Sequence, residues 1–233
     1  RVARRAFRNF GKYLTEIMRF PSMGQAELNE LVTIDVKSLE HLRLAREHGR
    51  GIIFVSAHFG NFEIGGARIA QEIPLTVVAD ELENTRLMDF LVTNREHKNV
   101  VILPPQGATR RVLAALRRNE MVGFMMDLGP RAHELDNVEA TFFGVRTAFP
   151  TMAAALARVS GAAIIVAAVT RDRDNSFKGV AVPPIFVEKT KSEGDLERAT
   201  QTVVHALEGL MRPQPDQWYI FRPMWPAAVD AAT

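Results

Sequence analysis

The sequence has no cysteine among its 233 residues, and this absence excludes several kinds of chemistry at once. Without thiols the chain can form no disulfide framework, no thiolate nucleophile, no cysteine-ligated zinc or iron–sulfur site and no enzyme-bound thioester. The six histidines offer no tight metal-ligand spacing, so we expect no metal site. A bound cofactor is not expected either.

Long apolar runs are also missing. The longest candidate, residues 149–169, is interrupted by Arg158, Ser160 and Gly161, so we expect no segment of the sequence to span a bilayer. The first residues, Arg1-Val2-Ala3-Arg4-Arg5, lack the apolar core of a secretory signal. Because the sequence starts with Arg rather than Met, we expect a processed or truncated N-terminus.

Charge of either sign is not in large excess. The formal net charge is only +2, which gives no reason to expect nucleic acid as a partner. The composition is 47% hydrophobic and 24% charged, which is typical of globular proteins and excludes collagen-like or disordered chains. No Pro/Gly/Ser-rich linker divides the chain, so we expect one domain with a large core.

Apolar strand-like runs alternate with segments of helical periodicity. The expected strands are 51–57, 75–79, 100–103, 121–126, 163–170, 180–187 and 218–221. The expected helices are 36–48, 61–71, 84–98, 107–118, 147–160 and 194–211. Several strand runs are continuously apolar, as in strands covered on both faces. The alternation predicts a layered α/β domain with a mainly parallel or mixed sheet flanked by helices.

The N-terminal segment has a helical pattern of its own. Apolar residues recur at three- and four-residue steps on one stripe, namely Ala3, Phe7, Phe10, Leu14 and Ile17. Basic residues crowd the rest of the first three turns, namely Arg1, Arg4, Arg5, Arg8 and Lys12. Residues 1–20 therefore form either a basic amphipathic helix that lies on a membrane surface or a helix packed on the domain with solvated charges.

Common catalytic motifs are absent, and one segment remains as the candidate site. The sequence has no P-loop, no G-x-G-x-x-G and no G-x-S-x-G. The apolar run 52–57 leads directly into His58, then Gly60-Asn61 and the start of a helix. In an open α/β sheet ligands bind at the carboxyl ends of strands, so His58 occupies the expected position for a general base.

Glu63 follows His58 by five residues. A bend at Gly60 and a helix that starts at Asn61 would let Glu63 fold back and orient the imidazole. No activated serine accompanies the pair, which favours direct transfer to an acceptor hydroxyl that His58 deprotonates. The alternative is structural: a histidine at the end of a strand and a glutamate favoured in the first helical turn by the helix dipole.

Five sequence blocks in order resemble a known family. They are the segment 51–63 with its H-x-x-x-x-E pattern, Thr93-Asn94-Arg95-Glu96, Phe124-Met125-Met126-Asp127, Thr141-Phe142-Phe143-Gly144 and Gln217-Trp218. Together they resemble the lysophospholipid acyltransferase superfamily. More narrowly, they are similar to the bacterial lipid A biosynthesis (lauroyl/myristoyl) acyltransferases and to the phosphatidylinositol mannoside acyltransferases.

The resemblance implies an enzyme that moves a fatty acyl group from acyl carrier protein or coenzyme A to a glycolipid hydroxyl. By position, it implies His58 as the general base and Glu63 as its partner. It also implies that Arg95 holds a phosphate or the oxyanion and that Asp127 contacts Arg95 or the sugar head group. The backbone at Gly60-Asn61 is a second candidate for oxyanion donors.

The segment Phe143-Gly144 is expected to place an aromatic ring and a turn beside the acyl chain, with simple core packing as the alternative.

The same resemblance favours a protein at the cytoplasmic face of the inner membrane. It assigns residues 1–20 to a membrane-surface helix and 21–233 to the acyltransferase domain, and the protein is expected to be either peripheral or anchored by a segment missing upstream. The C-terminal block keeps only Arg222 of the family's basic residues, and no second acid follows Asp127 closely. These departures leave the acceptor open. An acyl-thioester or lysolipid hydrolase and a non-catalytic lipid-binding protein remain the alternative functions.

Overall fold

The computed structural model describes residues 1–78, 85–96, 98–104, 106–128, 137–189, 194–221 and 224–225. Its helices are α1 (Val2–Arg19), α2 (Gln25–Leu31), α3 (Val36–Glu47), α4 (Phe62–Ile69), α5 (Thr85–Glu96), α6 (Ala108–Arg117), α7 (Met152–Ser160) and α8 (Asp195–Met211), with 3₁₀ turns η1 (Phe20–Ser22) and η2 (Pro215–Gln217). Its strands are β1 (Val32–Ile34), β2 (Ile52–Ser56), β3 (Leu75–Val78), β4 (Val100–Leu103), β5 (Met121–Met125), β6 (Asn137–Phe142), β7 (Val145–Pro150), β8 (Ala163–Arg171) and β9 (Phe177–Ala181).

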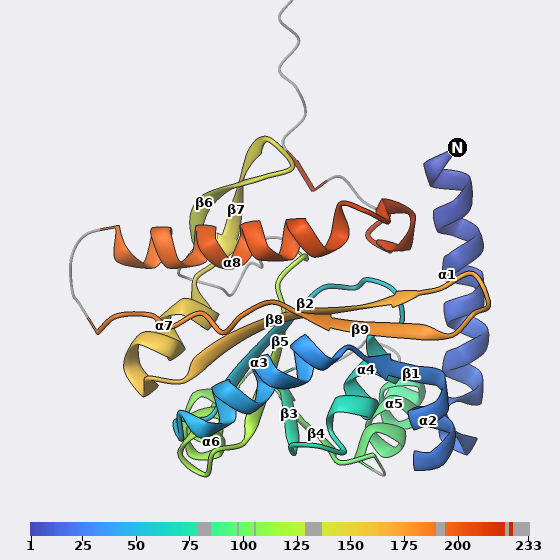
Figure 1. Cartoon of the computed structure of the whole chain (residues 1–233), viewed down its shortest axis with the longest axis horizontal. Helices are drawn as coiled ribbons and strands as arrows, with labels where there is room; N and C mark the ends of the chain where they lie inside the picture. The colour runs from blue at the N-terminus through green and yellow to red at the C-terminus, as the bar shows by residue number, and fades with distance from the viewer. Residues whose placement is uncertain are drawn as a thin grey trace, which may run out of the picture.

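The strands form a seven-stranded sheet in the order β1-β9-β8-β2-β5-β3-β4, together with a separate β6–β7 hairpin (Figure 1). Every neighbouring pair in the large sheet is parallel except β8–β9, which is antiparallel. The expected fold class, an α/β domain with a mainly parallel or mixed sheet, is confirmed. β2 lies in the middle of this sheet, so its carboxyl end is flanked by strands on both sides.

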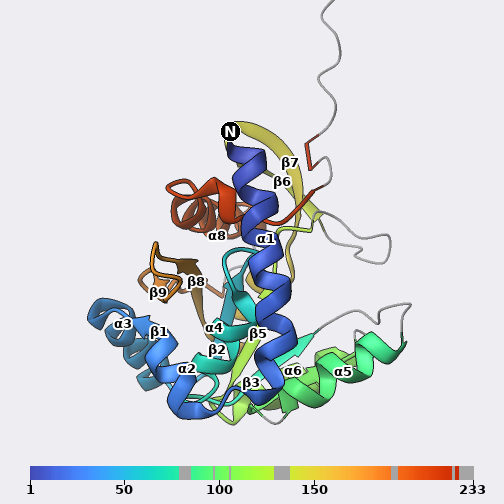
Figure 2. The same cartoon turned by 90° about the vertical axis from the view of Figure 1, so that its right-hand side faces the viewer.

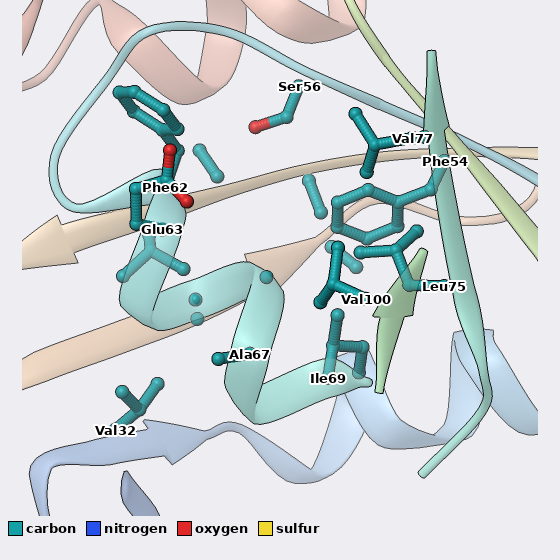
Figure 3. Close-up of a pocket in the computed structure, with 18 of the residues that line it drawn as sticks. Val32, Phe54, Ser56, Phe62, Glu63, Ala67, Ile69, Leu75, Val77 and Val100 are labelled. Carbon is teal, nitrogen blue, oxygen red and sulfur yellow. The ribbon is translucent and has the colours of Figure 1, made fainter. Parts of the chain in front are cut away.

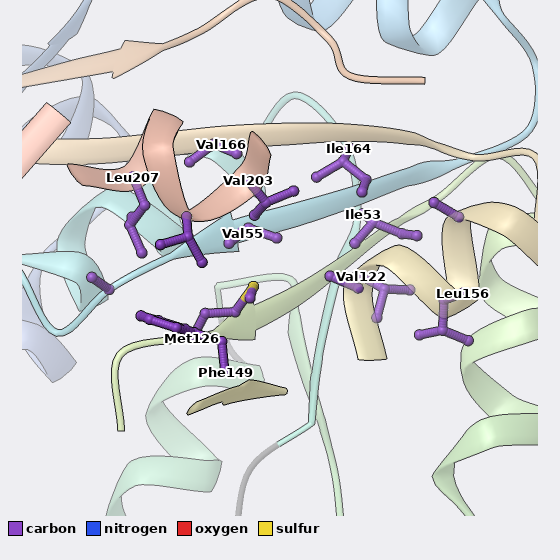
Figure 4. Close-up of a cluster of buried hydrophobic side chains, with 14 of the residues drawn as sticks. Ile53, Val55, Val122, Met126, Phe149, Leu156, Ile164, Val166, Val203 and Leu207 are labelled. Atoms are coloured by element: carbon purple, nitrogen blue, oxygen red, sulfur yellow. The ribbon is translucent and has the colours of Figure 1, made fainter. Parts of the chain in front are cut away.

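Side chains of the central strands alternate between two cores because successive residues of a strand point to opposite faces. Ile53 and Val55 of β2 pack with α6, α7 and α8 on one face (Figure 4). Ile52 and Phe54 pack on the other face, where α3 and α4 supply Leu42 and Ile69. The continuously apolar runs in the sequence therefore correspond to strands buried on both faces.

Helix α1 crosses the carboxyl ends of β2 and β8 rather than lying flat on either face (Figure 2). Its inner side contacts residues far along the chain: Phe10 packs against Tyr219, and Tyr13 stacks on Phe62 with ring centroids 5.2 Å apart. Glu16 pairs with Arg171 at the end of β8. Helix α1 is therefore joined to the edge of the sheet where His58 is found.

Three expected elements differ from the structure. The expected helix 147–160 begins only at Met152, because Val145–Pro150 pairs with β6 as a strand. The expected strand 180–187 is instead β9, Phe177–Ala181, since Pro183 and Pro184 follow and cannot donate to a strand ladder. The expected strand 218–221 is absent; Trp218 makes one isolated bridge with Phe59.

The sequence patterns missed α2, β1 and β6. Within the described residues, no helix is long and apolar enough to cross a membrane. The expected elements at 75–79 and 84–98 include Ala79, Asn84 and His97, and these lie outside the described residues, as does Arg222.

Candidate active site

His58 lies two residues beyond the end of β2, in the loop that leads to α4. The loop is held by the segment that follows η2. The backbone N–H of Tyr219 donates to the carbonyl of His58 at 3.0 Å, and the N–H of Gly60 donates to the carbonyl of Gln217 at 2.9 Å. The side chain of His58 is 26% exposed, so the imidazole is anchored but still accessible to a substrate.

Asp127 is the carboxylate behind the imidazole. Its Oδ1 lies 2.8 Å from Nδ1 of His58, and its Oδ2 accepts the backbone N–H of His58 at 2.8 Å. The indole N–H of Trp218 donates to the same Oδ2 at 2.8 Å. The Asp127 side chain is fully buried. A buried carboxylate at Nδ1 keeps a proton there and leaves Nε2 as the basic nitrogen, the arrangement a general base needs.

This pairing corrects the expectation for Glu63. β2 and β5 are parallel neighbours with Ser56 opposite Met125, so residues two positions further along each strand come side by side. These residues are His58 and Asp127. Glu63 sits in the first turn of α4 and points to Arg95 instead of to the imidazole.

Glu63 and Arg95 form a second buried pair. Nε of Arg95 donates to Oε2 of Glu63 at 2.8 Å, and Nη2 donates to Oε1. The side chains are 7% and 17% exposed, respectively. Burial opposes the charged form of Arg95, but the charge and hydrogen bonds of Glu63 outweigh it and raise the pKa of Arg95. The guanidinium therefore stays protonated although it is largely buried.

An apolar cavity of about 960 Å³, open mouth included, runs between α4 and the sheet (Figure 3). Glu63 and Arg95 lie in its wall, and the remaining lining is mostly aliphatic and aromatic. Its lining includes Val32, Phe54, Ser56, Phe62, Gly66, Ala67, Ile69, Leu75, Val77, Val100 and Gly123. Figure 3 shows Phe62 and Glu63 at one end of α4 and Ile69, Leu75 and Val100 at the other. The cavity, which has one charged pair in its wall, is otherwise suited to a hydrocarbon chain.

Asn61 and Gly60 have structural partners. Oδ1 of Asn61 caps α4 by accepting the N–H of Ile64 at 3.0 Å, and its Nδ2 donates to Oε2 of Glu16 at 2.7 Å. Since the N–H of Gly60 already donates to Gln217, it is not the oxyanion donor that the sequence led us to expect. Gly60 has a positive φ of 63°, and a Cβ there would lie 1.6 Å from the carbonyl oxygen of Val169.

Phe143 and Gly144 form the turn between β6 and β7, and both have positive φ. Phe143 stacks against Trp218 with centroids 6.2 Å apart, and its backbone N–H donates to Glu208 at 2.6 Å. Neither residue belongs to the lining of the apolar cavity. The contacts of Phe143 are packing contacts, and the expected contact of this turn with an acyl chain stays a prediction.

Comparison with known proteins shows the family of the chain. Residues 1–226 match the family described as bacterial lipid A biosynthesis acyltransferase. The chain belongs to this family. It is 30% identical to a phosphatidylinositol mannoside acyltransferase of Mycolicibacterium smegmatis over 96% of this chain and 72% of that protein. A lipid A biosynthesis lauroyltransferase of Escherichia coli is 27% identical over 79% of this chain and 59% of its own length. This protein is therefore an acyltransferase.

Two residues of the acyltransferase site escaped the sequence analysis. Trp218 stood out only as part of a Gln-Trp block, and nothing in the pattern pointed to Asp127 as its partner. Glu16 carried no signal, because only the fold brings α1 beside Asn61 and Arg171. No cluster of His, Asp or Glu suited to a metal ion occurs among the described residues.

Proposed function

We propose that this acyltransferase moves a fatty acyl group from an acyl thioester, carried by acyl carrier protein or coenzyme A, to a hydroxyl of a glycolipid. The observation that carries the proposal is the hydrogen bond of 2.8 Å between Nδ1 of His58 and buried Asp127 at the carboxyl edge of the sheet. The relatives are named as transferases of phosphatidylinositol mannoside and lipid A biosynthesis, which supports a glycolipid acceptor.

In the proposed reaction Nε2 of His58 takes the proton of the acceptor hydroxyl as its oxygen attacks the thioester carbonyl. The tetrahedral intermediate then collapses, the C–S bond breaks, and the imidazolium returns its proton to the departing thiolate. Asp127 stabilises the imidazolium between these two steps. Nη1 of Arg95, which takes no part in the contact with Glu63, donates to the oxyanion or to a phosphate of a substrate.

The apolar cavity receives the acyl chain in this proposal. Its lining is apolar apart from Glu63, Arg95 and two serines, and burial of a chain there stabilises the complex by about 0.8 kcal/mol per methylene. The charged pair Glu63–Arg95 then lies beside the head of the chain, where the polar thioester and acceptor meet.

The test is mass spectrometry of products after incubation with mixed acyl donors and a panel of glycolipid acceptors. We expect acylated glycolipid from the wild type and a loss of about 10²–10⁴-fold in kcat for His58→Ala. Free fatty acid released at the same rate with and without acceptor would instead identify a hydrolase. Lipid binding without turnover by the wild type would contradict both enzymatic assignments.

The outer side of α1 supports the proposal that the enzyme works at a membrane surface, on the cytoplasmic face of the inner membrane. Phe7, Leu14 and Met18 are 62%, 48% and 78% exposed and recur at helical spacing along one side. Arg4 and Arg8 adjoin this ridge, and neither forms an ion pair with another residue in the described part of the chain. An exposed apolar ridge beside these cations fits an anionic lipid surface.

Vesicle sedimentation tests the membrane proposal. Each basic residue near an anionic surface contributes about 1 kcal/mol, so the double change Arg4→Gln and Arg8→Gln is expected to weaken binding about 30-fold at low salt. The change of Lys37→Gln and Arg46→Gln on α3 alters the net charge equally and is the control. Equal loss of binding in both double variants would refute the assignment of α1 as the membrane surface.

A further inference from the structure

We infer that Trp218 is a positioning residue for the catalytic pair, acting through Asp127 rather than on the substrate. The inference rests on the proposed function, because it concerns how His58 is held for proton transfer. Its basis is a hydrogen bond from Nε1 of Trp218 to Oδ2 of Asp127, 2.8 Å long.

The hydrogen bonds at Asp127 define the orientation of its carboxylate. Oδ2 accepts the indole N–H of Trp218 and the backbone N–H of His58, which leaves Oδ1 directed at Nδ1 of the imidazole. A carboxylate attached through one rotatable bond would otherwise turn away from a single partner. The two donors at Oδ2 prevent this rotation, and both come from parts of the chain distant from Asp127, the His58 backbone from 69 residues away and the indole from 91 residues away.

The indole itself is held on several sides. Trp218 stacks on Phe143 and meets the ring edge of Phe142, and Trp225 completes this aromatic cluster. The flanking residues tie the backbone of the same segment to the His58 loop: Gln217 accepts from Gly60, and Tyr219 donates to His58. The segment 217–219 therefore fixes the imidazole twice, through the backbone of its loop and through Asp127.

The chain supplies a matched control. It contains only two tryptophans, and Trp225 lies in the same aromatic cluster, but its N–H donates to the carbonyl of Phe142 at 3.3 Å rather than to Asp127. Trp218→Phe and Trp225→Phe thus remove the same atoms from the same cluster. Only the first removes a donor from the catalytic carboxylate.

Steady-state acyl transfer to a glycolipid is measured for the wild type and both variants. We expect kcat to fall about 10-fold in Trp218→Phe, the typical effect of one hydrogen bond to a charged group, with KM for the acyl donor unchanged. Trp225→Phe is expected to stay within twofold of the wild type. Equal kcat in the two variants, or a rise in KM alone for Trp218→Phe, would overturn the inference.

A shape-preserving substitution separates the N–H from packing. In the Trp225→Phe background, incorporation of a benzothiophene analogue of tryptophan replaces Trp218 alone and exchanges its N–H for sulfur. We expect this protein to lose kcat as Trp218→Phe does, with an unchanged thermal midpoint. Full activity would refute the positioning role. If the wild type and the Trp225→Phe parent were both inactive, the proposed function would be refuted instead. Failure of the positioning role and failure of the proposed function are therefore distinguishable.

The Nδ1–H resonance of His58 in ¹⁵N-histidine-labelled protein gives a readout that does not depend on turnover. Loss of the indole donor leaves Asp127 a stronger acceptor for the remaining partners, so the resonance is expected to move downfield in Trp218→Phe and to stay in Trp225→Phe. An identical resonance in all three proteins would contradict the contact.

Discussion

Replacement of Asp127 by asparagine is the sharpest test of which carboxylate serves His58. Three N–H donors face the Asp127 oxygens: two at Oδ2, from Trp218 and the His58 backbone, and Nδ1–H of His58 at Oδ1. An amide has one acceptor oxygen, and the two N–H donors keep that oxygen at the position of Oδ2. Its NH₂ group then faces Nδ1, so the imidazole must accept there and carry its proton on Nε2.

This change of tautomer removes the lone pair that would take the proton of the acceptor hydroxyl. An asparagine behind a catalytic histidine in a related arrangement lowers kcat about 10⁴-fold, and we expect a loss of about 10³–10⁴-fold for Asp127→Asn. Glu63→Gln is the matched control, because Glu63 lies in the first turn of α4, two residues after Asn61, but contacts Arg95 rather than His58. We expect its kcat to fall less than 10-fold.

The assay is acyl transfer from acyl-coenzyme A under saturating donor, followed by thiol release and by mass spectrometry of the glycolipid. Thermal midpoints of both variants show whether either loss reflects unfolding. A loss above 100-fold for Glu63→Gln, with less than 10-fold for Asp127→Asn, would refute the pairing and restore Glu63 as the partner of His58.

Three further changes test the cavity, a helix cap and the loop glycine. Gly66→Leu places a side chain into the apolar cavity, where a Cβ would lie 3.8 Å from Cδ2 of Leu75. We expect kcat/KM to fall about fourfold for each methylene of the acyl chain that is displaced, and short acyl donors to be preferred. Asp35→Ala removes the N-cap of α3 and is expected to lower the free energy of unfolding by about 1 kcal/mol at neutral pH in denaturant titrations, whereas Asp35→Asn keeps the cap. Backbone hydrogen bonding lowers the pKa of Asp35, so its contribution is present above the unfolded-state pKa and is lost as the pH falls through the folded-state pKa; a constant difference down to strongly acidic pH would contradict this. Gly60→Ala forces a Cβ to within 1.6 Å of the Val169 carbonyl oxygen and is expected to cost more than about 4 kcal/mol, whereas Gly144→Ala meets no atom within 4 Å and bears only the strain of positive φ, about 1–2 kcal/mol; similar thermal midpoints for both would refute the steric argument.

Much of the sheet was predictable because strands buried on both faces require continuous apolar runs. The expected strands 51–57 and 100–103 correspond to β2 and β4, with an error of one residue at each end of β2 and none for β4. The hairpin formed by β6 and β7 was not predictable in the same way. Val145–Pro150 adjoins an Ala-rich helix, and only its pairing with β6 makes it a strand rather than the first turns of α7.

The sequence predicted some of the residues of the site, but not which carboxylate pairs with His58. His58 and Asp127 each follow an apolar run, and a parallel sheet collects such residues at one edge. The short spacing from His58 to Glu63 favoured a local pair. The register of β2 and β5 decided otherwise, since Ser56 opposite Met125 brings Asp127 level with His58.

The order of residues by itself determined which segments are buried, where the polar groups leave the strands, and the family to which the chain belongs, because these depend on local composition and spacing. Only the tertiary structure decided which carboxylate meets the imidazole, that Glu63 and Arg95 form a separate pair beside the apolar cavity, and that Trp218 reaches Asp127 from 91 residues away. Such contacts depend on strand register and on the return of the chain after α8, and no local pattern encodes either of them.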